Sequence, residues 1–317
     1  MKKAPFILAS IIASMFFMSG CSGMNAFVAG ENDIIINAGT EWELKGILTL
    51  PEGKAPFPAI VVVAGSGHDD DYTVLTDLLA KQGIASIRHI KRPTAYLSTI
   101  GVDFTIKEES VADALSAVAL AKGIKKISPD KVFVLGHSQG GSIIPKINEA
   151  DKENIIAGFI CFAGSTRSPG EHIKEIADVM LLFPDMSEET KSLRSRGRLR
   201  QYEDIKNLTE ADRGSKNEIL GYYPTWWLDM ADYNPAISAQ NIKKPILFLQ
   251  GSHDDNMLPD NMDVWKDATK NNQKAVYKFY SGLNHDLMRT EKFGGRAAAL
   301  VDEEVIADIT SFIKDQD

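Results

Sequence analysis

Residues 131–147 read KVFVLGHSQGGSIIPKI, and this stretch decides the fold of the chain. The segment KVFVLG is apolar and rich in valine, as a strand buried on both faces should be. The segment SIIPKINEA, which follows, has the pattern of a helix. Between them lies G-x-S-x-G, in which Gly136 and Gly140 permit a sharp turn that exposes Ser138. The stretch therefore predicts a strand, a tight turn that carries a serine, and a helix.

Further strand candidates occur along the chain, and helix-like segments separate most of them. They read DIIINA, EWELKGILTLP, FPAIVVVAG, ASIRHI, IIAGFICFAG, PILFLQG and AVYKFYSG. Strands that alternate with helices indicate a mostly parallel sheet that is covered on both faces. We therefore predict an α/β fold with about eight strands, the first two antiparallel at one edge. A final helix is expected over residues 296–314, and residues 33–317 are expected to form a single domain.

Residues 165–240 interrupt this alternation. They contain charged, helix-like sequence such as SEETKSLRSRGRLRQYEDIKNL and no strand pattern. We interpret them as a helical cap inserted near one end of the sheet. The cap contains Trp226 and Trp227. These two side chains would either wall an acyl or aryl pocket or attach the insertion to the core, and the sequence leaves both alternatives open.

The N-terminus has the features of an export signal. Residues 1–20 begin with MKK and continue with the short apolar run FILASIIASMFFM, which predicts a signal peptide. The following Cys21 completes a sequence that resembles the lipobox of bacterial lipoproteins, which implies cleavage before Cys21 and lipid attachment to its sulfur. Ser22 after the cysteine implies the outer membrane, and residues 21–32 would form a tether. A plain secreted protein is the alternative.

Composition narrows the classes of function. The chain is 44% hydrophobic and 25% charged, which is ordinary for a globular protein with a sizeable core. The net charge is −8, and removal of the signal with its two lysines changes it to −10. No basic stripe is present, so nucleic acid is not an expected partner. Cys161 lies in the apolar run IIAGFICFAG and is expected to be a buried thiol.

A serine hydroxyl becomes a useful nucleophile only when a neighbouring base takes its proton. After a G-x-S-x-G turn, the expected partners are an acidic residue and then a histidine, in that chain order. Asp254 follows the strand candidate PILFLQG, with Asp255 as the less favoured alternative, and His285 follows the last strand candidate. We therefore predict a catalytic set of Ser138, Asp254 and His285. The competing interpretations are a small turn residue, a turn-capping carboxylate and a surface histidine.

A substrate oxyanion needs backbone N–H donors that are already in position. One expected donor is Gln139, at the helix N-terminus behind the serine. The other is Ser66, in the loop AGSGHDDD, where His68 is expected to lie near the substrate. A flexible loop is the alternative, and a phosphate-binding loop is disfavoured because no G-K-[ST] follows. The run HDD at residues 253–255 is not expected to bind metal, since adjacent side chains of an extended chain diverge.

These residues resemble those of the α/β-hydrolase superfamily. More narrowly, the chain is similar to bacterial serine carboxylesterases with a Gly-Ser-Gly-Pro oxyanion loop, an R-Y-D-K-R-G stretch and a G-H-S-E-G-G elbow. The resemblance begins at about residue 41 and includes VVVAGSG, IRHIKR, LGHSQGG, FAGSTRSPGE, YNP and LQGSHD. It implies an α/β-hydrolase fold and a cofactor-independent hydrolase of small-molecule esters, with the triad on Ser138, Asp254 and His285.

The chain departs from those motifs at the rim of the expected pocket. His68 stands at the proline of the oxyanion loop, and Gln139 at the glutamate of the elbow. The triad residue types are unaffected, so these departures bear on the substrate more than on the reaction. Two other functions remain open: a peptidase or thioesterase that uses the same triad, and a non-catalytic surface lipoprotein that binds a ligand.

Overall fold

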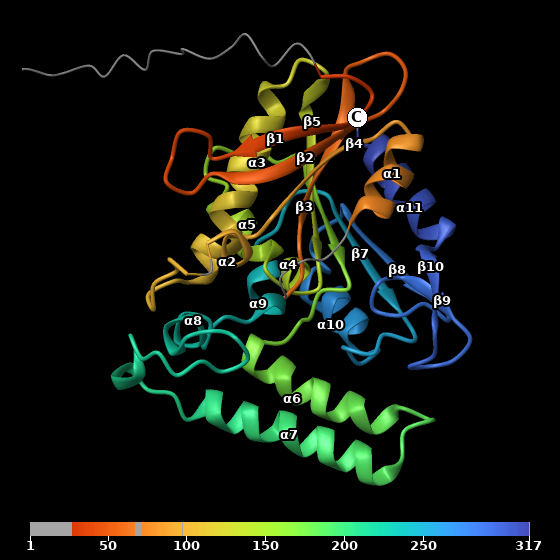
Figure 1. The fold of residues 1–317 in the computed structure, drawn as a ribbon. Coiled ribbons are helices and arrows are strands. Elements are labelled where there is room, and N and C mark those ends of the chain that lie inside the picture. Colours follow the sequence, from red (N-terminus) through yellow and green to blue (C-terminus); the bar gives the residue numbers. More distant parts are fainter. Residues whose placement is uncertain (1–26, 67–71, 97, 317) are drawn as a thin grey trace, which may run out of the picture.

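The structure is a computed structural model that describes residues 27–66, 72–96 and 98–316. Over these residues, eight strands form one sheet in the order β1-β2-β4-β3-β5-β6-β7-β8 (Figure 1). The strands are β1 (Gly30–Ile36), β2 (Leu44–Leu50), β3 (Phe57–Val63), β4 (Ala85–His89), β5 (Ile127–His137), β6 (Gly158–Phe162), β7 (Ile246–Gly251) and β8 (Ala275–Tyr280). Strands β3 to β8 run parallel, whereas β1 and β2 are antiparallel to their neighbours. The predicted fold class is confirmed.

Helices cover both faces of the sheet, as the unbroken apolar strands require. Apolar side chains of α1 (Thr73–Lys81) and α11 (Glu303–Lys314) share a buried cluster with β3 and β5 residues such as Ile60 and Leu135. On the opposite face, α3 (Ala112–Gly123), α5 (Ile144–Ala150) and α10 (Asn261–Ala268) pack over residues such as Val61 and Val134. Figure 1 shows these two helical layers on either side of the strands.

The predicted helical insertion lies between β6 and β7. It contains α6 (Pro169–Val179), η2 (Met180–Leu182), α7 (Glu188–Lys206), η3 (Glu210–Asp212), α8 (Pro224–Asp229) and α9 (Pro235–Ala239). The side chains of Ser168 and Ser187 cap α6 and α7 by accepting a backbone N–H, which explains where each helix begins. The two helices lie side by side beyond the sheet (Figure 1), and the hydroxyl of Tyr202 donates to Glu171 between them, at 2.7 Å.

Two predicted boundaries were wrong. The helix expected over residues 296–314 begins only at Glu303, because the Asp302 side chain accepts the Glu304 N–H and caps it there. The residues before the cap form β10 (Ala297–Val301), which pairs with β9 (Met288–Thr290). At the other end, the expected tether over residues 21–32 is too long, because β1 already pairs with β2 from Gly30.

The register of the sheet shows at which end of the parallel strands the chain enters it. Gly30 pairs with Leu50, and the adjoining Thr49 pairs with Ser86 at the start of β4. Since β4 runs parallel to β3, the chain enters the sheet at the amino ends of the parallel strands. The residues predicted to do chemistry follow the opposite, carboxyl ends. Within the described ranges, no helix combines the length and the apolar character that a membrane crossing requires.

Candidate active site

The carboxyl ends of four parallel strands bring the predicted site residues to one edge of the sheet. Ser138 directly follows β5, Asp254 follows β7, His285 follows β8 and Ser66 follows β3. Neighbouring parallel strands end at the same edge, so residues far apart in the sequence meet there. His68 and Cys21 lie outside the described residues.

Ser138 lies in a strained turn between β5 and α4 (Gln139–Ser142). Its φ of 55° and ψ of −117° are unusual for a residue with a side chain. Its N–H donates to the carbonyl of Phe162 at 2.9 Å, which fixes the turn against β6. The turn also requires its glycines: a Cβ at Gly136 would lie 2.2 Å from the Gly140 carbonyl oxygen, and one at Gly140 would lie 2.2 Å from that of Val63.

Asp254 and His285 are in direct contact. Nδ1 of His285 lies 3.0 and 3.1 Å from the two carboxylate oxygens of Asp254. The backbone N–H groups of Asn256 and Met257 donate to Oδ1 of Asp254 at 2.9 and 3.0 Å, which holds the carboxylate in place. Asp254 is 2% exposed and His285 is 7% exposed. With Nδ1 bound to Asp254, Nε2 is the nitrogen of His285 that is left to exchange a proton.

The environment of His285 favours its protonated form. Burial disfavours the charged imidazolium, but the charge and hydrogen bond of Asp254, with help from Asp286 and Asp255, raise the pKa of His285 to about 9. The protonated ring therefore stabilises the fold below pH 6.5, and this contribution is lost as the pH rises through about 9.

A pH profile tests this charge environment. If neutral His285 is the base, kcat/KM should rise about tenfold per pH unit and level off above about pH 9. Asp286→Asn should move the midpoint to lower pH, because the Asp286 charge raises the pKa of His285. The shift should be small, since the Asp286 side chain is 53% exposed. The measurement is ester hydrolysis from pH 6 to 10; a profile already flat at pH 7 would contradict the expectation.

His137, beside the predicted nucleophile, joins the parts of the site. Its ring centroid lies 5.1 Å from that of His285, and its Nε2 lies 3.4 Å from the His285 carbonyl oxygen. Its Nδ1 lies 2.9 Å from the hydroxyl of Tyr72, which accepts the Gly65 N–H at 3.1 Å. The His285 ring therefore lies against the residue before Ser138, and Tyr72 ties the loop after β3 to the same place.

The two expected oxyanion donors lie at the carboxyl edge of the sheet, where Gln139 directly follows Ser138 and Ser66 follows β3. Gln139 is the first residue of α4, so its N–H has no acceptor within the helix. Ser66 is exposed at the last described position of the loop after β3. Neither N–H has an acceptor among the residues that the structure describes. Both groups are therefore available to a ligand, and their role stays a prediction.

Trp226 and Trp227 lie in α8 and are 2% and 4% exposed. Nε1 of Trp226 donates to Glu109 at 2.7 Å, and Nε1 of Trp227 donates to the carbonyl of Ile219 at 3.0 Å. These contacts favour the interpretation that the two side chains attach the insertion to the core. Their contact with a substrate stays a prediction. Cys161 is a free, buried cysteine, and burial raises the pKa of its thiol to about 12, so it is a poor nucleophile.

Gly251, at the end of β7, has a part in the site that was not predicted from the sequence. A Cβ there would lie 2.0 Å from the carbonyl oxygen of Leu283, in the loop that carries His285. Gly251→Ala should therefore lower the free energy of unfolding by about 3 kcal/mol, measured by urea denaturation. The control is Gly197→Ala in α7, where a Cβ meets nothing within 4 Å; it should stabilise the protein by up to about 1 kcal/mol. Equal stability of Gly251→Ala and the unmodified protein would contradict this packing.

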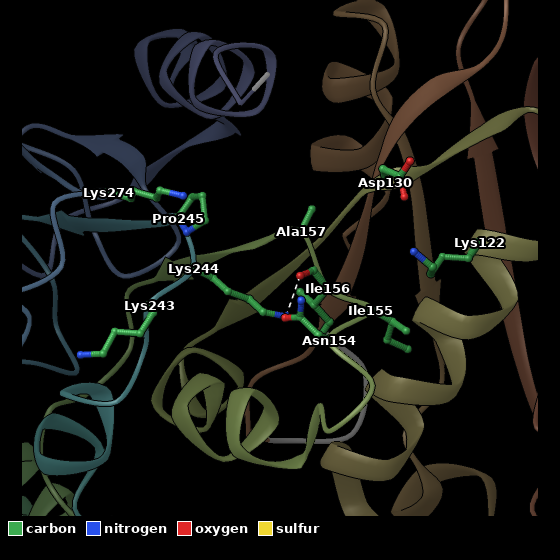
Figure 2. A pocket seen from close by; sticks show the side chains of 10 residues that line it. All are labelled: Lys122, Asp130, Asn154, Ile155, Ile156, Ala157, Lys243, Lys244, Pro245 and Lys274. Carbon is green, nitrogen blue, oxygen red and sulfur yellow. Dashed lines mark hydrogen bonds between the residues drawn. The ribbon is translucent and has the colours of Figure 1, made fainter.

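A pocket of about 360 Å³ lies at the amino ends of the strands, far from these residues. Four of its ten lining residues are lysines, shown in Figure 2: Lys122, Lys243, Lys244 and Lys274. It contains no residue of the predicted catalytic set, so it is not the candidate active site. Over the described ranges, no group of three or more His, Cys, Asp and Glu side chains is arranged to hold a metal ion.

The sheet order, its two helical layers and the site at the carboxyl edge define an α/β-hydrolase fold. Residues 55–292 match the family described as serine aminopeptidase, S33. The match extends over more than half of the sequence, and the chain belongs to this hydrolase family.

Known proteins similar to this chain include several esterases. Esterase EstD of Thermotoga maritima is 28% identical over 274 residues, which cover 82% of this chain and 61% of that protein. Two solved structures share the fold. Est1E from Butyrivibrio proteoclasticus has 17% identity and a TM-score of 0.56, and the match covers 90% of this chain and 98% of that chain. The thermophilic carboxylesterase EstE1 from a metagenomic library has 14% identity and a TM-score of 0.61, and the match covers 92% of each chain. At these identities the structural similarity shows the fold alone.

Proposed function

We propose that this protein is a serine esterase that hydrolyses carboxylic esters of small molecules through an acyl-enzyme. One observation carries the proposal: His285 makes a buried contact with Asp254, and the His285 imidazole lies against His137, the residue that precedes Ser138. Similarity to an esterase over 274 residues supports an ester as the bond that is hydrolysed. No cofactor is needed for this chemistry.

In the proposed mechanism, Nε2 of His285 takes the proton of the Ser138 hydroxyl as its oxygen attacks the ester carbonyl. Asp254 holds the ring through Nδ1 and stabilises the imidazolium that forms. The N–H groups of Ser66 and Gln139 bind the developing oxyanion. The alcohol leaves with the proton from His285, and a water molecule, activated by the same nitrogen, releases the acid and restores Ser138.

An aminopeptidase is the second candidate, because the family description names that activity. The same triad hydrolyses amides and esters, so the residues above do not separate the two. A thioesterase uses the same steps. The expected export of the chain argues against acyl-CoA as the substrate. A ligand-binding protein without catalysis would need none of the strain at Ser138 or the buried carboxylate behind His285.

We also propose that the protein is exported and held on a bacterial membrane, in the outer membrane, by a lipid on Cys21. The support is the sequence of residues 1–21: a cationic start, a short apolar run and a lipobox-like end. Mass spectrometry of the N-terminal peptide from membranes of producing cells tests it. An unmodified Cys21, or cleavage elsewhere, would contradict it.

Two measurements on residues 21–317 test the enzyme proposal. Reaction with a fluorophosphonate should place the label on Ser138, and His285→Ala should strongly reduce the labelling. A panel of p-nitrophenyl esters with increasing acyl length should be hydrolysed faster than aminoacyl p-nitroanilides. Preference for the anilides would favour the aminopeptidase, and absence of both label and turnover in folded protein would favour the ligand-binding alternative.

A further inference from the structure

A buried lysine lies between the two segments that are proposed to bind the oxyanion. Lys91 follows β4 and precedes α2 (Arg92–Ala95), and its side chain is 5% exposed. Its Nζ donates to the carbonyl of Gly65 at 2.9 Å and to Oε1 of Gln139 at 2.9 Å, and it pairs with Oε1 of Glu109 at 2.7 Å. An ammonium group has three N–H donors. The two hydrogen bonds and the ion pair together fix the position of the ammonium.

Glu109 compensates the buried charge. It lies in the wide helical turn η1 (Lys107–Val111), which leads into α3, and its side chain is 1% exposed. It also accepts from Nε1 of Trp226 at 2.7 Å and from the hydroxyl of Tyr222 at 3.2 Å. Removing one partner of a buried ion pair strands the other charge, so the pair should be changed together.

Tyr222 closes the network into a ring. Its hydroxyl accepts from Nε2 of Gln139 at 3.1 Å and donates to Glu109. Burial and the negative charge of Glu109 raise the pKa of Tyr222, so the phenol keeps the proton that it donates. Lys91, Gln139, Tyr222 and Glu109 therefore hold one another in a single arrangement.

The bond from Lys91 to Gly65 acts on the Ser66 N–H through the peptide unit that the two residues share. In a trans peptide the carbonyl of one residue and the N–H of the next lie in one plane and point in opposite directions. Fixing the Gly65 oxygen therefore fixes the direction of the Ser66 N–H. A cationic donor on the carbonyl also polarises the unit, which makes the N–H a stronger donor.

We propose that Lys91 is a positioning residue of the active site, which aims the Ser66 N–H at the substrate oxyanion and holds it in register with Gln139. This inference rests on the proposed function. The competing explanation is that Lys91 only neutralises the buried Glu109. The two differ in what they change: positioning acts on the transition state, whereas neutralisation acts on stability.

The deciding variant is Lys91→Met with Glu109→Gln, which removes both charges of the pair. Positioning predicts that kcat falls by about 10–100-fold, less than the loss of a complete oxyanion donor. KM should stay within about twofold, because the substrate before attack carries no oxyanion. The inhibition constant of an alkylboronic acid, which forms an anionic adduct on the serine, should rise by the same factor as kcat falls.

The matched control is Lys244→Met with Asp151→Asn at the opposite edge of the sheet. There Nζ of Lys244 pairs with Asp151 at 2.5 Å and donates to the carbonyl of Ile156 at 2.7 Å, beside the pocket of Figure 2. This is the same combination of a lysine, a buried carboxylate and a backbone carbonyl, without the active site. The control should lose stability and keep its kcat and its boronate affinity.

A double variant of Lys91 and Glu109 with kcat and boronate affinity within about twofold of the unmodified protein would overturn the inference. Gln139→Leu is the second variant, and it leaves the ion pair in place. It removes one acceptor of Lys91 and should lower kcat by about three- to tenfold at unchanged KM; unchanged kcat would also count against positioning. Failure of the proposed function itself looks different, since the unmodified protein would then neither turn over esters nor depend on Ser138.

Discussion

Ser138→Ala should leave almost no ester hydrolysis, with kcat lowered by about 10⁴–10⁶, by analogy with serine hydrolases whose triads have been altered. The variant removes the atom that attacks the carbonyl. The oxyanion donors and the pocket remain, so a small rate above that of water should persist. The fold should be unaffected, because the side chain of Ser138 makes no hydrogen bond within the described part of the chain. Initial rates with p-nitrophenyl acetate, together with urea denaturation, check both statements.

Ser281→Ala is the control for this variant. Ser281 is exposed and follows β8. Among the described residues, its one hydrogen bond is made by its backbone carbonyl, which accepts from Arg289. Its loss should leave kcat and fluorophosphonate labelling unchanged. Purified Ser138→Ala protein with a rate near that of the unmodified protein would refute the assignment of the nucleophile.

Asp254→Asn should lower kcat by about 10⁴, as the same change does in serine proteases. An amide can present its N–H₂ to Nδ1 of His285, which would place the ring proton on Nε2. That nitrogen could then no longer accept the proton of Ser138. The variant also removes the largest of the charges that raise the pKa of His285. The midpoint of the pH profile of the remaining activity should therefore move to lower pH.

Asp255→Asn is the matched control for Asp254→Asn, because the two carboxylates are adjacent in the chain. The described hydrogen bond of the Asp255 side chain is with Asn256, and His285 has its carboxylate contact with Asp254. Asp255 acts on His285 only through its charge, so its loss should change kcat by about threefold or less. Steady-state kinetics on both variants decides between them. A larger loss for Asp255→Asn than for Asp254→Asn would reverse the assignment of the acid.

The sequence was sufficient to predict the sheet and which residues gather at its edge. Apolar segments such as FPAIVVV and PILFLQG allow little choice of structure, and in a parallel sheet the residues after such strands share one edge. This is why Ser138, Asp254 and His285 could be placed at that edge in advance, and the contact with His285 is made by Asp254, as preferred, and not by Asp255. Their catalytic roles stay a prediction.

Contacts that depend on three-dimensional packing could not be predicted. Nothing in the local sequence joins Lys91 to Glu109, because their contact depends on the wide turn η1. The close approach of Leu283 to Gly251 likewise appears only when two strand ends are adjacent. At residues 297–301 the run AAALV favours a helix by propensity, but pairing with β9 overrides this preference. In each case a tertiary contact, absent from the local sequence, decided the outcome.

The register of β1 also determines where the candidate active site lies relative to the N-terminal end of the described chain. The chain enters the sheet at the amino ends of the parallel strands, whereas Ser138 lies beyond their carboxyl ends, roughly 20 Å away along six paired residues. An attachment through residues before Phe27 would thus join the protein at the amino ends of the parallel strands. The candidate active site, at their carboxyl ends, would lie on the side away from the attachment. Dissolved esters would reach Ser138 by diffusion from the aqueous side. If the proposed lipid anchor holds the protein on a bilayer, lipids of that bilayer would first have to leave it. Immobilisation through the N-terminus should accordingly preserve turnover of soluble substrates, whereas attachment near α7 should obstruct it.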